Sequence, residues 1–201
     1  MTARLAQKPT VDSLNRVIPF SDDRWKRLHK IVTEKSLLLG DYTLASGRNS
    51  SFLFQLRQTT LHPEGAALIG EIIVGFMQEK GIRCLGGLAL GAVPIVATTA
   101  SASFRLGYEV EAFFVRKEAK EHGAKELVNG YITDGCEILA VDDVTTTGGS
   151  MMKAIKGTAD EHGCTVKWAL SVVDREEGAE ETLGEQGIKL VSIFRKSDFS
   201  I

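Results

Sequence analysis

One stretch decides the fold of this chain, namely Ile138-Leu139-Ala140-Val141-Asp142-Asp143-Val144-Thr145-Thr146-Thr147-Gly148-Gly149-Ser150. Its four leading apolar residues predict a buried strand of a parallel sheet. Two carboxylates, three threonines and two glycines follow, and the apolar period of residues 151–162 then predicts a helix. A strand that runs through a tight polar turn into a helix presents backbone N–H groups and the positive end of the helix dipole. The stretch therefore predicts a phosphate site.

The two aspartates define what else the ligand must carry. The chain has no Gly-x-x-x-x-Gly-Lys and no Gly-x-Gly-x-x-Gly after a strand, so neither common nucleotide loop is present. Asp142 and Asp143 would repel a bare phosphate, but they suit a ligand that also brings hydroxyl donors or a divalent cation. A ribose with a 5-phosphate and a Mg²⁺-chelated pyrophosphate supplies both. The alternative is an Asp pair that only caps the turn and the helix.

Bulk composition excludes several classes of protein. The chain has 201 residues, 43% of them hydrophobic and 25% charged, and a net charge of −2. This length suits one α/β domain, and the lack of a basic excess argues against a nucleic-acid binder. The three cysteines are dispersed and form no Cys-x-x-Cys, so neither a disulfide framework nor a zinc site is indicated. No signal-peptide core is present at the start, and we expect a cytoplasmic protein.

One uncharged stretch, residues 84–104, is long enough to span a bilayer. It contains glycines, Pro94 and a run of Ser and Thr, and it divides into a strand, a turn and a helix with proline near its first turn. We therefore expect no membrane span.

The remaining chain alternates between β and α patterns. The expected elements are a helix capped by Ser21 that carries Leu38 on its apolar face and ends at Gly40, a hairpin over 42–58, a helix from Pro63 to Gly81, strand 84–88, a helix from Pro94, strand 109–115, strand 138–141, helix 151–162, strand 166–174, helix 179–187 and strand 190–194. Such alternation predicts a mainly parallel sheet flanked by helices, in a single domain over residues 1–201. Residues 1–20 show no period and are expected to form an irregular arm.

Residues 116–130 break this pattern. They are dense in charge and nearly free of large apolar side chains, so they cannot pack into a core. The segment is either a solvated loop or hairpin without a role, or a functional loop. In an open α/β sheet, ligands bind beyond the carboxyl ends of the strands. Four segments follow such ends: 88–92, 116–117, 142–148 and 174–175.

At this point a family resemblance becomes clear. Residues 138–150 resemble the phosphoribosyl pyrophosphate (PRPP) motif of the type I phosphoribosyltransferases. Residues 113–123, Phe-Phe-Val-Arg-Lys-Glu-Ala-Lys-Glu-His-Gly, are similar to the flexible catalytic loop of the orotate phosphoribosyltransferases. Residues 42–51, Tyr-Thr-Leu-Ala-Ser-Gly-Arg-Asn-Ser-Ser, resemble the N-terminal substrate segment of that family. Together with Asp174 and Arg175, they point to orotate as the acceptor.

The resemblance implies transfer of the 5-phosphoribosyl group from PRPP to orotate, giving orotidine 5′-phosphate and pyrophosphate. It implies Mg²⁺ held mainly through PRPP rather than by the protein, and a homodimer with shared active sites. Lys120, Asp142 and Asp143 would be catalytic. PRPP would be bound by Arg116, Lys117, Lys120, His122, Asp142, Asp143, Val144, Thr145, Thr146, Thr147, Gly148 and Gly149. Orotate would contact Phe54, Thr146 and Arg175.

Three positions depart from the family pattern. Many relatives have lysines where this chain has Ala45 and Gly91, and we expect the backbone of the Leu90 turn, with Arg48 or Arg57, to replace part of their role. Leu53 replaces a commonly aromatic residue. Two other functions compete with the implied one: phosphoribosyl transfer to a different base, and a PRPP-sensing regulator that has lost catalysis.

Overall fold

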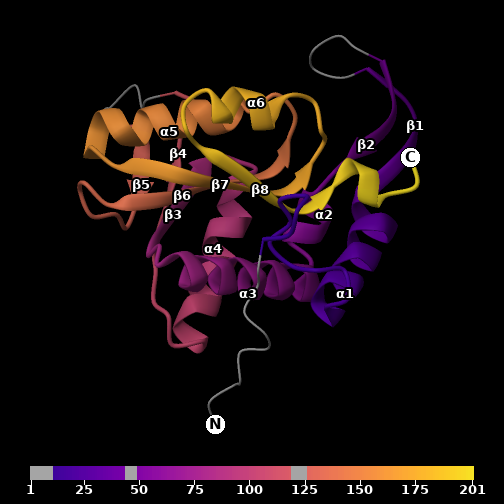
Figure 1. Cartoon of the computed structure of the whole chain (residues 1–201), viewed down its shortest axis with the longest axis horizontal. Coiled ribbons are helices and arrows are strands. Elements are labelled where there is room, and N and C mark those ends of the chain that lie inside the picture. The colour runs from indigo at the N-terminus through magenta and orange to yellow at the C-terminus, as the bar shows by residue number, and fades with distance from the viewer. Residues whose placement is uncertain (1–10, 44–48, 119–125) are drawn as a thin grey trace.

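The computed structural model describes residues 11–43, 49–118 and 126–201. At its centre is a six-stranded sheet in the order β5-β4-β3-β6-β7-β8 (Figure 1). The strands are β3 (Cys84–Leu88), β4 (Glu111–Val115), β5 (Val128–Gly130), β6 (Glu137–Thr145), β7 (Thr165–Asp174) and β8 (Lys189–Arg195). Every pairing in this sheet is parallel except that of β4 with β5. The predicted mainly parallel sheet is confirmed.

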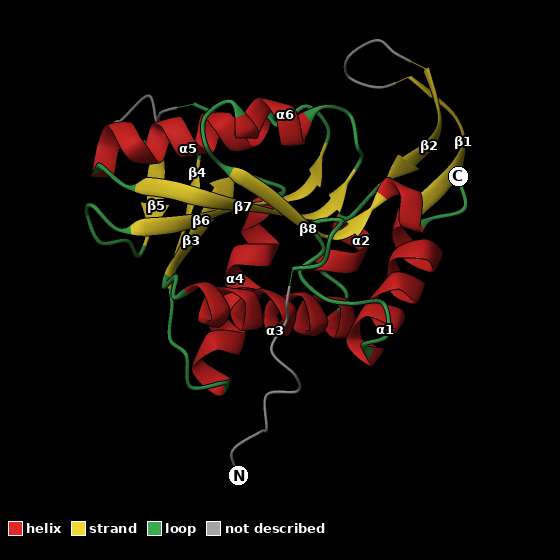
Figure 2. Cartoon of the chain, in the orientation of Figure 1, coloured by secondary structure: helices red, strands yellow, loops and turns green. Residues whose placement is uncertain are grey.

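Helices cover both faces of the sheet (Figure 2). On one face lie α3 (Pro63–Lys80) and α4 (Ala92–Arg105), and on the other lie α5 (Gly149–His162) and α6 (Ala179–Gly184). Side chains alternate along β6 accordingly, because successive residues of a strand point to opposite faces. Leu139 and Val141 pack in the cluster that contains the α3 residues, while Ala140 packs with Met151 and Leu183. A strand buried on both faces explains the continuous apolar run in the sequence.

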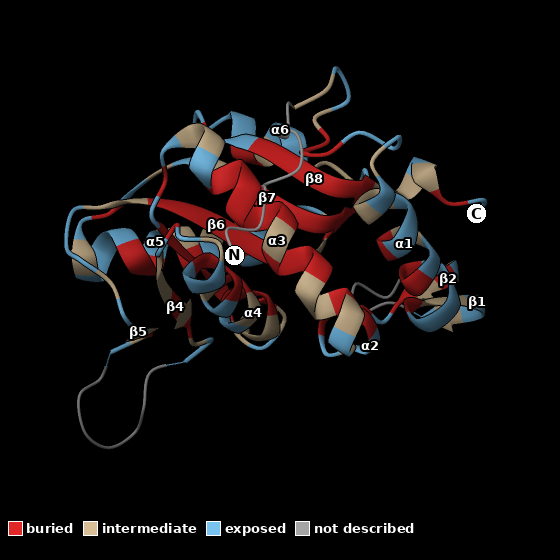
Figure 3. Ribbon diagram, turned by 90° about the horizontal axis from the view of Figure 1, so that it is seen from below, coloured by how far each residue is buried: buried red, intermediate tan, exposed pale blue. Residues whose placement is uncertain are grey.

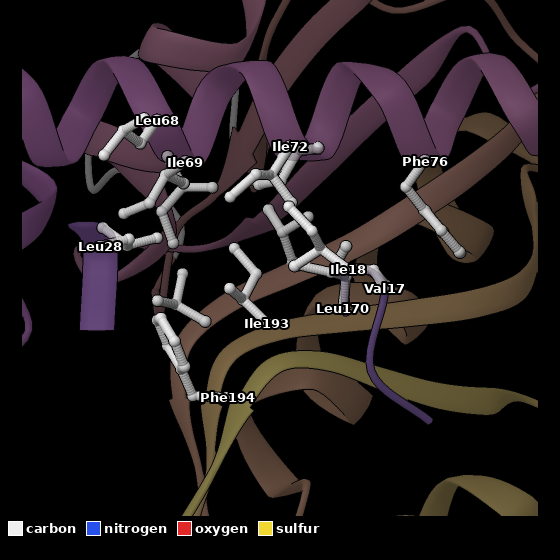
Figure 4. Packing of buried hydrophobic residues seen from close by; sticks show 14 of the residues in the cluster. Val17, Ile18, Leu28, Leu68, Ile69, Ile72, Phe76, Leu170, Ile193 and Phe194 are labelled. Atoms are coloured by element: carbon white, nitrogen blue, oxygen red, sulfur yellow. The ribbon is translucent and has the colours of Figure 1, made fainter. Parts of the chain in front are cut away.

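The larger core lies between α3 and strands β7 and β8. Ile69 and Ile72 of α3 face Leu170 and Ile193 of those strands (Figure 4). Pro63 begins α3, and Gly81 ends it in the left-handed conformation at φ 73°, as predicted. The buried residues concentrate in the strands of the sheet and on the helix faces that pack against it (Figure 3).

The described part of the N-terminal arm packs into this core. Residues 11–20 contain no helix or strand beyond an isolated bridge between Arg16 and Ser192. Val17 and Ile18 are nevertheless fully buried and belong to the core cluster (Figure 4). The arm is thus irregular in its backbone and anchored through these two side chains.

The first helix differs from the prediction. α1 (Asp23–Ile31) is capped by Asp22, not Ser21, since the Asp22 carboxylate accepts from the Arg24 N–H. It continues as a single π-helical turn (Val32–Ser36), and Leu38 already lies in β1 (Leu37–Thr43), where it pairs with Leu53. The prediction of a helix through Leu38 is wrong because pairing with β2 overrides a local apolar period.

The hairpin itself is confirmed. β1 and β2 (Asn49–Phe54) pair antiparallel and project away from the main sheet (Figure 1). The predicted second strand is too long, because α2 (Arg57–Thr60) follows it directly. Residues 44–48, which include Ala45 and Arg48, lie outside the described residues.

Two further predictions are resolved by the fold. The uncharged stretch 84–104 divides into β3, a turn and α4, and among the described residues no helix has the length and apolarity of a membrane span. Of the charge-dense segment 116–130, residues 128–130 form β5, with Val128 buried, so its described end is the second strand of a hairpin with β4. The polar segment between these strands is therefore shorter than predicted.

Candidate active site at the carboxyl edge of the sheet

The predicted site segments meet at one edge of the sheet. Leu88 pairs with Val115, and Thr145 pairs with Asp174, so β3 ends level with β4 and β6 ends level with β7. The turns that follow, at 89–91, 116–118 and 146–148, and the residue Arg175 consequently leave the sheet on the same side. The four strand ends therefore reach the same edge of the sheet, as predicted.

A cleft of about 840 Å³ opens between the hairpin and these strand ends. The residues around it are Leu53, Phe54, Gln55, Leu56, Arg57, Ala89, Leu90, Gly91, Phe114, Arg116, Lys117, Glu118 and Asp143. It brings together three predicted PRPP residues, because Arg116, Lys117 and Asp143 all line it. Arg57, proposed above as a substitute cation, also lines it. The cleft thus combines three cationic side chains, which suit a pyrophosphate, with the carboxylates of Asp143 and Glu118.

A smaller hollow of about 280 Å³ surrounds the turn before α5. Its lining is Asp142, Val144, Thr145, Thr146, Thr147, Gly148, Gly149, Ser150 and Lys153. Gly148 adopts φ 82°, which glycine tolerates and which turns the chain into α5. The N-terminal N–H groups of α5 therefore open into the hollow, and the helix dipole favours an anion there.

Within this turn the three threonines are not equivalent. Thr145 is 2% exposed, and its hydroxyl lies 3.8 Å from the Met151 sulfur, so its side chain is part of the core. Thr146 is half-buried and Thr147 is exposed. Lys153 is a site residue that the sequence interpretation missed. Its signal was present, since a lysine in the early part of a helix opposes the dipole unless an anion lies nearby.

The two aspartates lie inside β6, not after it as predicted, because the strand continues to Thr145. Asp142 is 7% exposed, and its Oδ1 accepts from the Asp143 N–H at 3.0 Å. Burial, and then the neighbouring Asp143 carboxylate, raise the pKa of Asp142 to about 8. Asp142 faces the smaller hollow and Asp143 the larger cleft, so the pair joins the two.

This raised pKa makes the stability of the ligand-free protein depend on pH. Between the ordinary Asp value and about pH 8 the folded state binds more protons than the unfolded state, so stability falls as pH rises through that window. Asp142→Asn should remove this decline. At about pH 9 the variant should be more stable than the parent by at least about 1.4 kcal/mol, the value of one pKa unit, and the difference should shrink toward about pH 5. Urea unfolding at both pH values measures it, and equal pH profiles of the two proteins would contradict it.

Gly91 leaves no space for a side chain as long as Asp143 keeps its position. A Cβ at Gly91 would lie 2.5 Å from Asp143 Oδ1 and 3.0 Å from Asp142 Oδ1. The lysine that many relatives carry here is therefore incompatible with this placement of Asp143. Leu90, beside it, is 69% exposed at the mouth of the cleft.

Gly91→Ala should consequently impair function more than stability. The backbone at Gly91 is right-handed helical at φ −56°, which alanine accepts, so the new methyl group acts mainly on the Asp143 carboxylate. If the aspartates bind PRPP as the family resemblance implies, loss of one charge-assisted hydrogen bond predicts a fall of about tenfold or more in kcat/KM for PRPP. Steady-state kinetics with a thermal melt measure both effects. Unchanged kinetics, or unfolding as the main effect, would contradict this.

Arg175 occupies a separate hollow of about 260 Å³, with Asn49, Ser50, Ser51, Phe52, Glu177 and Lys196. It is 5% exposed, its guanidinium lies 4.7 Å from the centre of the Phe52 ring, and its Nη2 is 2.8 Å from Glu177 Oε1. Its buried Nε has no acceptor among the described residues. Such an orphaned donor fits a missing anionic partner.

Three further residues were predicted to contact the substrates, and of these only Phe54 lies among the described residues. The Phe54 ring packs edge-on against Phe52 and Phe199, with centroids 5.7 and 5.1 Å away, so most of it belongs to the core. Leu53, on the opposite face of β2, lines the cleft beside it. Lys120 and His122 lie outside the described residues.

Comparison with known proteins agrees with this geometry. Residues 58–187 match the family model of a phosphoribosyl transferase domain. An orotate phosphoribosyltransferase of Bradyrhizobium sp. (strain BTAi1) is 43% identical over 177 residues, covering 86% of this chain and 95% of that protein. One from Rhodopirellula baltica is 33% identical over 85% of this chain and 91% of its own length. The crystal structure of Mycobacterium tuberculosis orotate phosphoribosyltransferase in complex with Fe(III) dicitrate superposes with a TM-score of 0.78 at 34% identity, covering 90% of this chain and all of that one.

Proposed function

The chain belongs to the phosphoribosyl transferase domain family and, within it, to the orotate phosphoribosyltransferases, and from this membership we propose the roles of its site residues. The enzyme transfers the 5-phosphoribosyl group of PRPP to orotate, giving orotidine 5′-phosphate and pyrophosphate in pyrimidine biosynthesis. In this reaction a ring nitrogen of orotate loses its proton and forms a bond to C1 of the ribose, as the bond from C1 to the pyrophosphate oxygen breaks and pyrophosphate leaves.

One observation carries the assignment of roles: Asp142 and Asp143 join an anion-binding hollow to a cationic cleft. We assign the hollow to the 5-phosphate, bound by the backbone and side chains of Thr146 and Thr147, Gly148, Gly149 and the added Lys153. The ribose would lie over the aspartates and donate its hydroxyls to them. The pyrophosphate would then extend into the cleft toward Arg116 and Lys117.

These residues act by position and charge. The transition state has an oxocarbenium-like sugar and a pyrophosphate that gains negative charge, so the carboxylates and the cations each stabilise the charge that develops next to them. Adjacent carboxylates in a polar cleft also fit Mg²⁺, which has oxygen ligands and usually remains bound to the substrate phosphates. Mg²⁺ bound through PRPP would neutralise pyrophosphate charge. No side-chain nucleophile is needed.

The Asp pair provides the experimental test. Asp143→Asn keeps the shape of the side chain but weakens a charge-assisted hydrogen bond to a ribose hydroxyl. It should reduce kcat/KM for PRPP by a factor that corresponds to a loss of about 1.5–3 kcal/mol in transition-state stabilisation. Asp160→Asn, on the exposed surface of α5, is the matched control and should leave the kinetics unchanged. Full activity of Asp143→Asn would mean that the pair is only a structural cap.

We further propose that the enzyme is a cytoplasmic homodimer in which each subunit contributes to its partner's site. Exposed apolar side chains support a contact: Leu61 between α2 and α3 and Leu90 at the cleft mouth are 68% and 69% exposed, and Phe104 at the far end of α4 is 73% exposed. α3 and α4 pack against each other, so these side chains lie on adjoining elements. Analytical sedimentation of the purified protein at several concentrations measures whether it is a monomer or a dimer.

A further inference from the structure

The three cysteines, which are dispersed in the sequence, meet at the amino edge of the sheet, opposite the active site. Cys84 begins β3, and Cys136 and Cys164 immediately precede β6 and β7. These strands are neighbours in the sheet, so their first residues lie side by side (Figure 1). The register places Cys84 opposite Glu111 of β4, and the pair Glu137 and Thr165 lies next to the other two cysteines.

The ligand atoms of Cys84, Cys136 and Glu111 are close enough to share one ion. The sulfurs of Cys136 and Cys164 are 3.4 Å apart. The sulfurs of Cys84 and Cys136 and a carboxylate oxygen of Glu111 lie within 4.8 Å of one another. Tetrahedral ligands of Zn²⁺ stand about 3.5–3.8 Å apart, given the usual Zn–S and Zn–O distances. The atoms of Cys84, Cys136 and Glu111 are therefore close to the spacing of one shell, and the Cys164 sulfur adjoins them through Cys136.

The Glu111 carboxylate is already held in place by hydrogen bonds. Both oxygens of the Glu111 carboxylate accept hydrogen bonds from Thr133, one from its N–H and one from its hydroxyl, each at 2.7 Å. The carbonyl of Thr133 lies 3.7 Å from the Cys164 sulfur. Ligating carboxylates in metal sites are held by outer partners in this way. Thr133 thus connects the carboxylate to the thiol cluster.

From these positions we propose that the three thiols and the Glu111 carboxylate bind one thiophilic divalent cation of the Zn²⁺ class. The site would link β3, β4, β6 and β7 at the edge that the substrates do not use.

The apolar side chains of Phe113, Ile138 and Ala154 belong to the same buried cluster as Cys84 and Cys164, whereas Cys136 and Glu111 are half-buried at its edge.

Cobalt titration tests this proposal directly. The reduced full-length protein, kept under anaerobic conditions, should bind one Co²⁺ per chain, with a thiolate-to-metal charge-transfer band and the visible bands of tetrahedral Co²⁺. Zn²⁺ should displace the Co²⁺, abolish the bands and raise the Tm. Cys84→Ser and Cys136→Ser should each weaken Co²⁺ binding by more than about tenfold, and Glu111→Gln should weaken it less.

Controls separate the site from adventitious binding and from misfolding. His162→Gln removes a nearby potential ligand that instead pairs with Asp134 at 2.7 Å, and it should leave the spectrum unchanged. Cys84→Ala and Cys136→Ala avoid a buried hydroxyl and repeat the test should a serine variant unfold. Phosphoribosyl transfer should persist in every folded variant. Binding that is insensitive to the cysteines, no thiolate band in the parent, or a disulfide between Cys136 and Cys164 in the purified protein would overturn the proposal.

Discussion

Replacing Lys120 by alanine should lower kcat by at least about a hundredfold, equivalent to about 2.7 kcal/mol, with little change in KM. The family resemblance places this lysine in the catalytic loop, between the cleft-lining Lys117 and β5. Its positive charge would meet the departing pyrophosphate, whose negative charge grows toward the transition state. An interaction that strengthens in this way raises kcat more than it lowers KM. Pre-steady-state and steady-state rates measure the effect.

The matched control is Lys156→Ala, which removes an exposed lysine from α5 outside the site and should leave kcat unchanged. If the loop reaches the partner's site, co-expression of Lys120→Ala with Asp143→Asn should restore activity, because the heterodimer contains one site built from intact parts. Verified heterodimers as inactive as both parents would show that the loop serves its own subunit. A full rate for Lys120→Ala alone would remove this residue from catalysis.

Arg175→Gln should lower kcat/KM for orotate by about a hundredfold or more. The guanidinium is buried over Phe52, and its Nε lacks an acceptor, so it is suited to pair with the carboxylate of orotate. Loss of one partner of a buried ion pair costs about 3–5 kcal/mol. Uracil lacks that carboxylate, so its slow turnover should not fall further and the preference for orotate should collapse. Competition kinetics with both bases measure this ratio.

A structural role for Arg175 predicts a different pattern. Glu177→Gln removes the charge that the guanidinium pairs with but keeps Arg175, and it should change orotate efficiency by only a few-fold if the arginine binds substrate. Should Arg175→Gln lower the Tm strongly and reduce orotate and uracil turnover equally, the residue would be a packing element and not a specificity residue.

The fold could be predicted from local pattern wherever one element buries its own apolar residues. The run 138–141 marked β6, and the period of Ile69, Ile72 and Phe76 marked α3. Prediction failed where pairing between distant segments decides the secondary structure of a residue. Leu38 continues a helical period but becomes a strand residue through Leu53, and Asp142 and Asp143 remain in strand conformation because β7 extends beside them. No local property of a polar residue indicates that a neighbouring strand continues.

As with the fold, the parts of the site that lie within one local stretch of sequence could be predicted, and the parts that depend on distant segments could not. The strand-turn-helix pattern identified the anion turn and the Asp pair, and the structure brings Arg116 and Lys117 to the same cleft. Lys153 was missed although its place in the early part of the predicted helix was a usable signal. The cysteines were missed because only the order of strands in the sheet brings Cys84, Cys136 and Cys164 together. Sequence spacing cannot reveal that order.

The central claim is that this chain joins orotate to PRPP, and the absorbance of orotate tests it most directly. On mixing the purified enzyme with orotate, PRPP and Mg²⁺, that absorbance should fall as orotidine 5′-phosphate forms. Uracil, adenine and hypoxanthine should react with kcat/KM at least about a hundredfold lower, because a site built for a carboxylate is left with an unpaired charge by bases that lack it. No loss of orotate absorbance, or comparable kcat/KM for one of the other bases, would contradict the assignment.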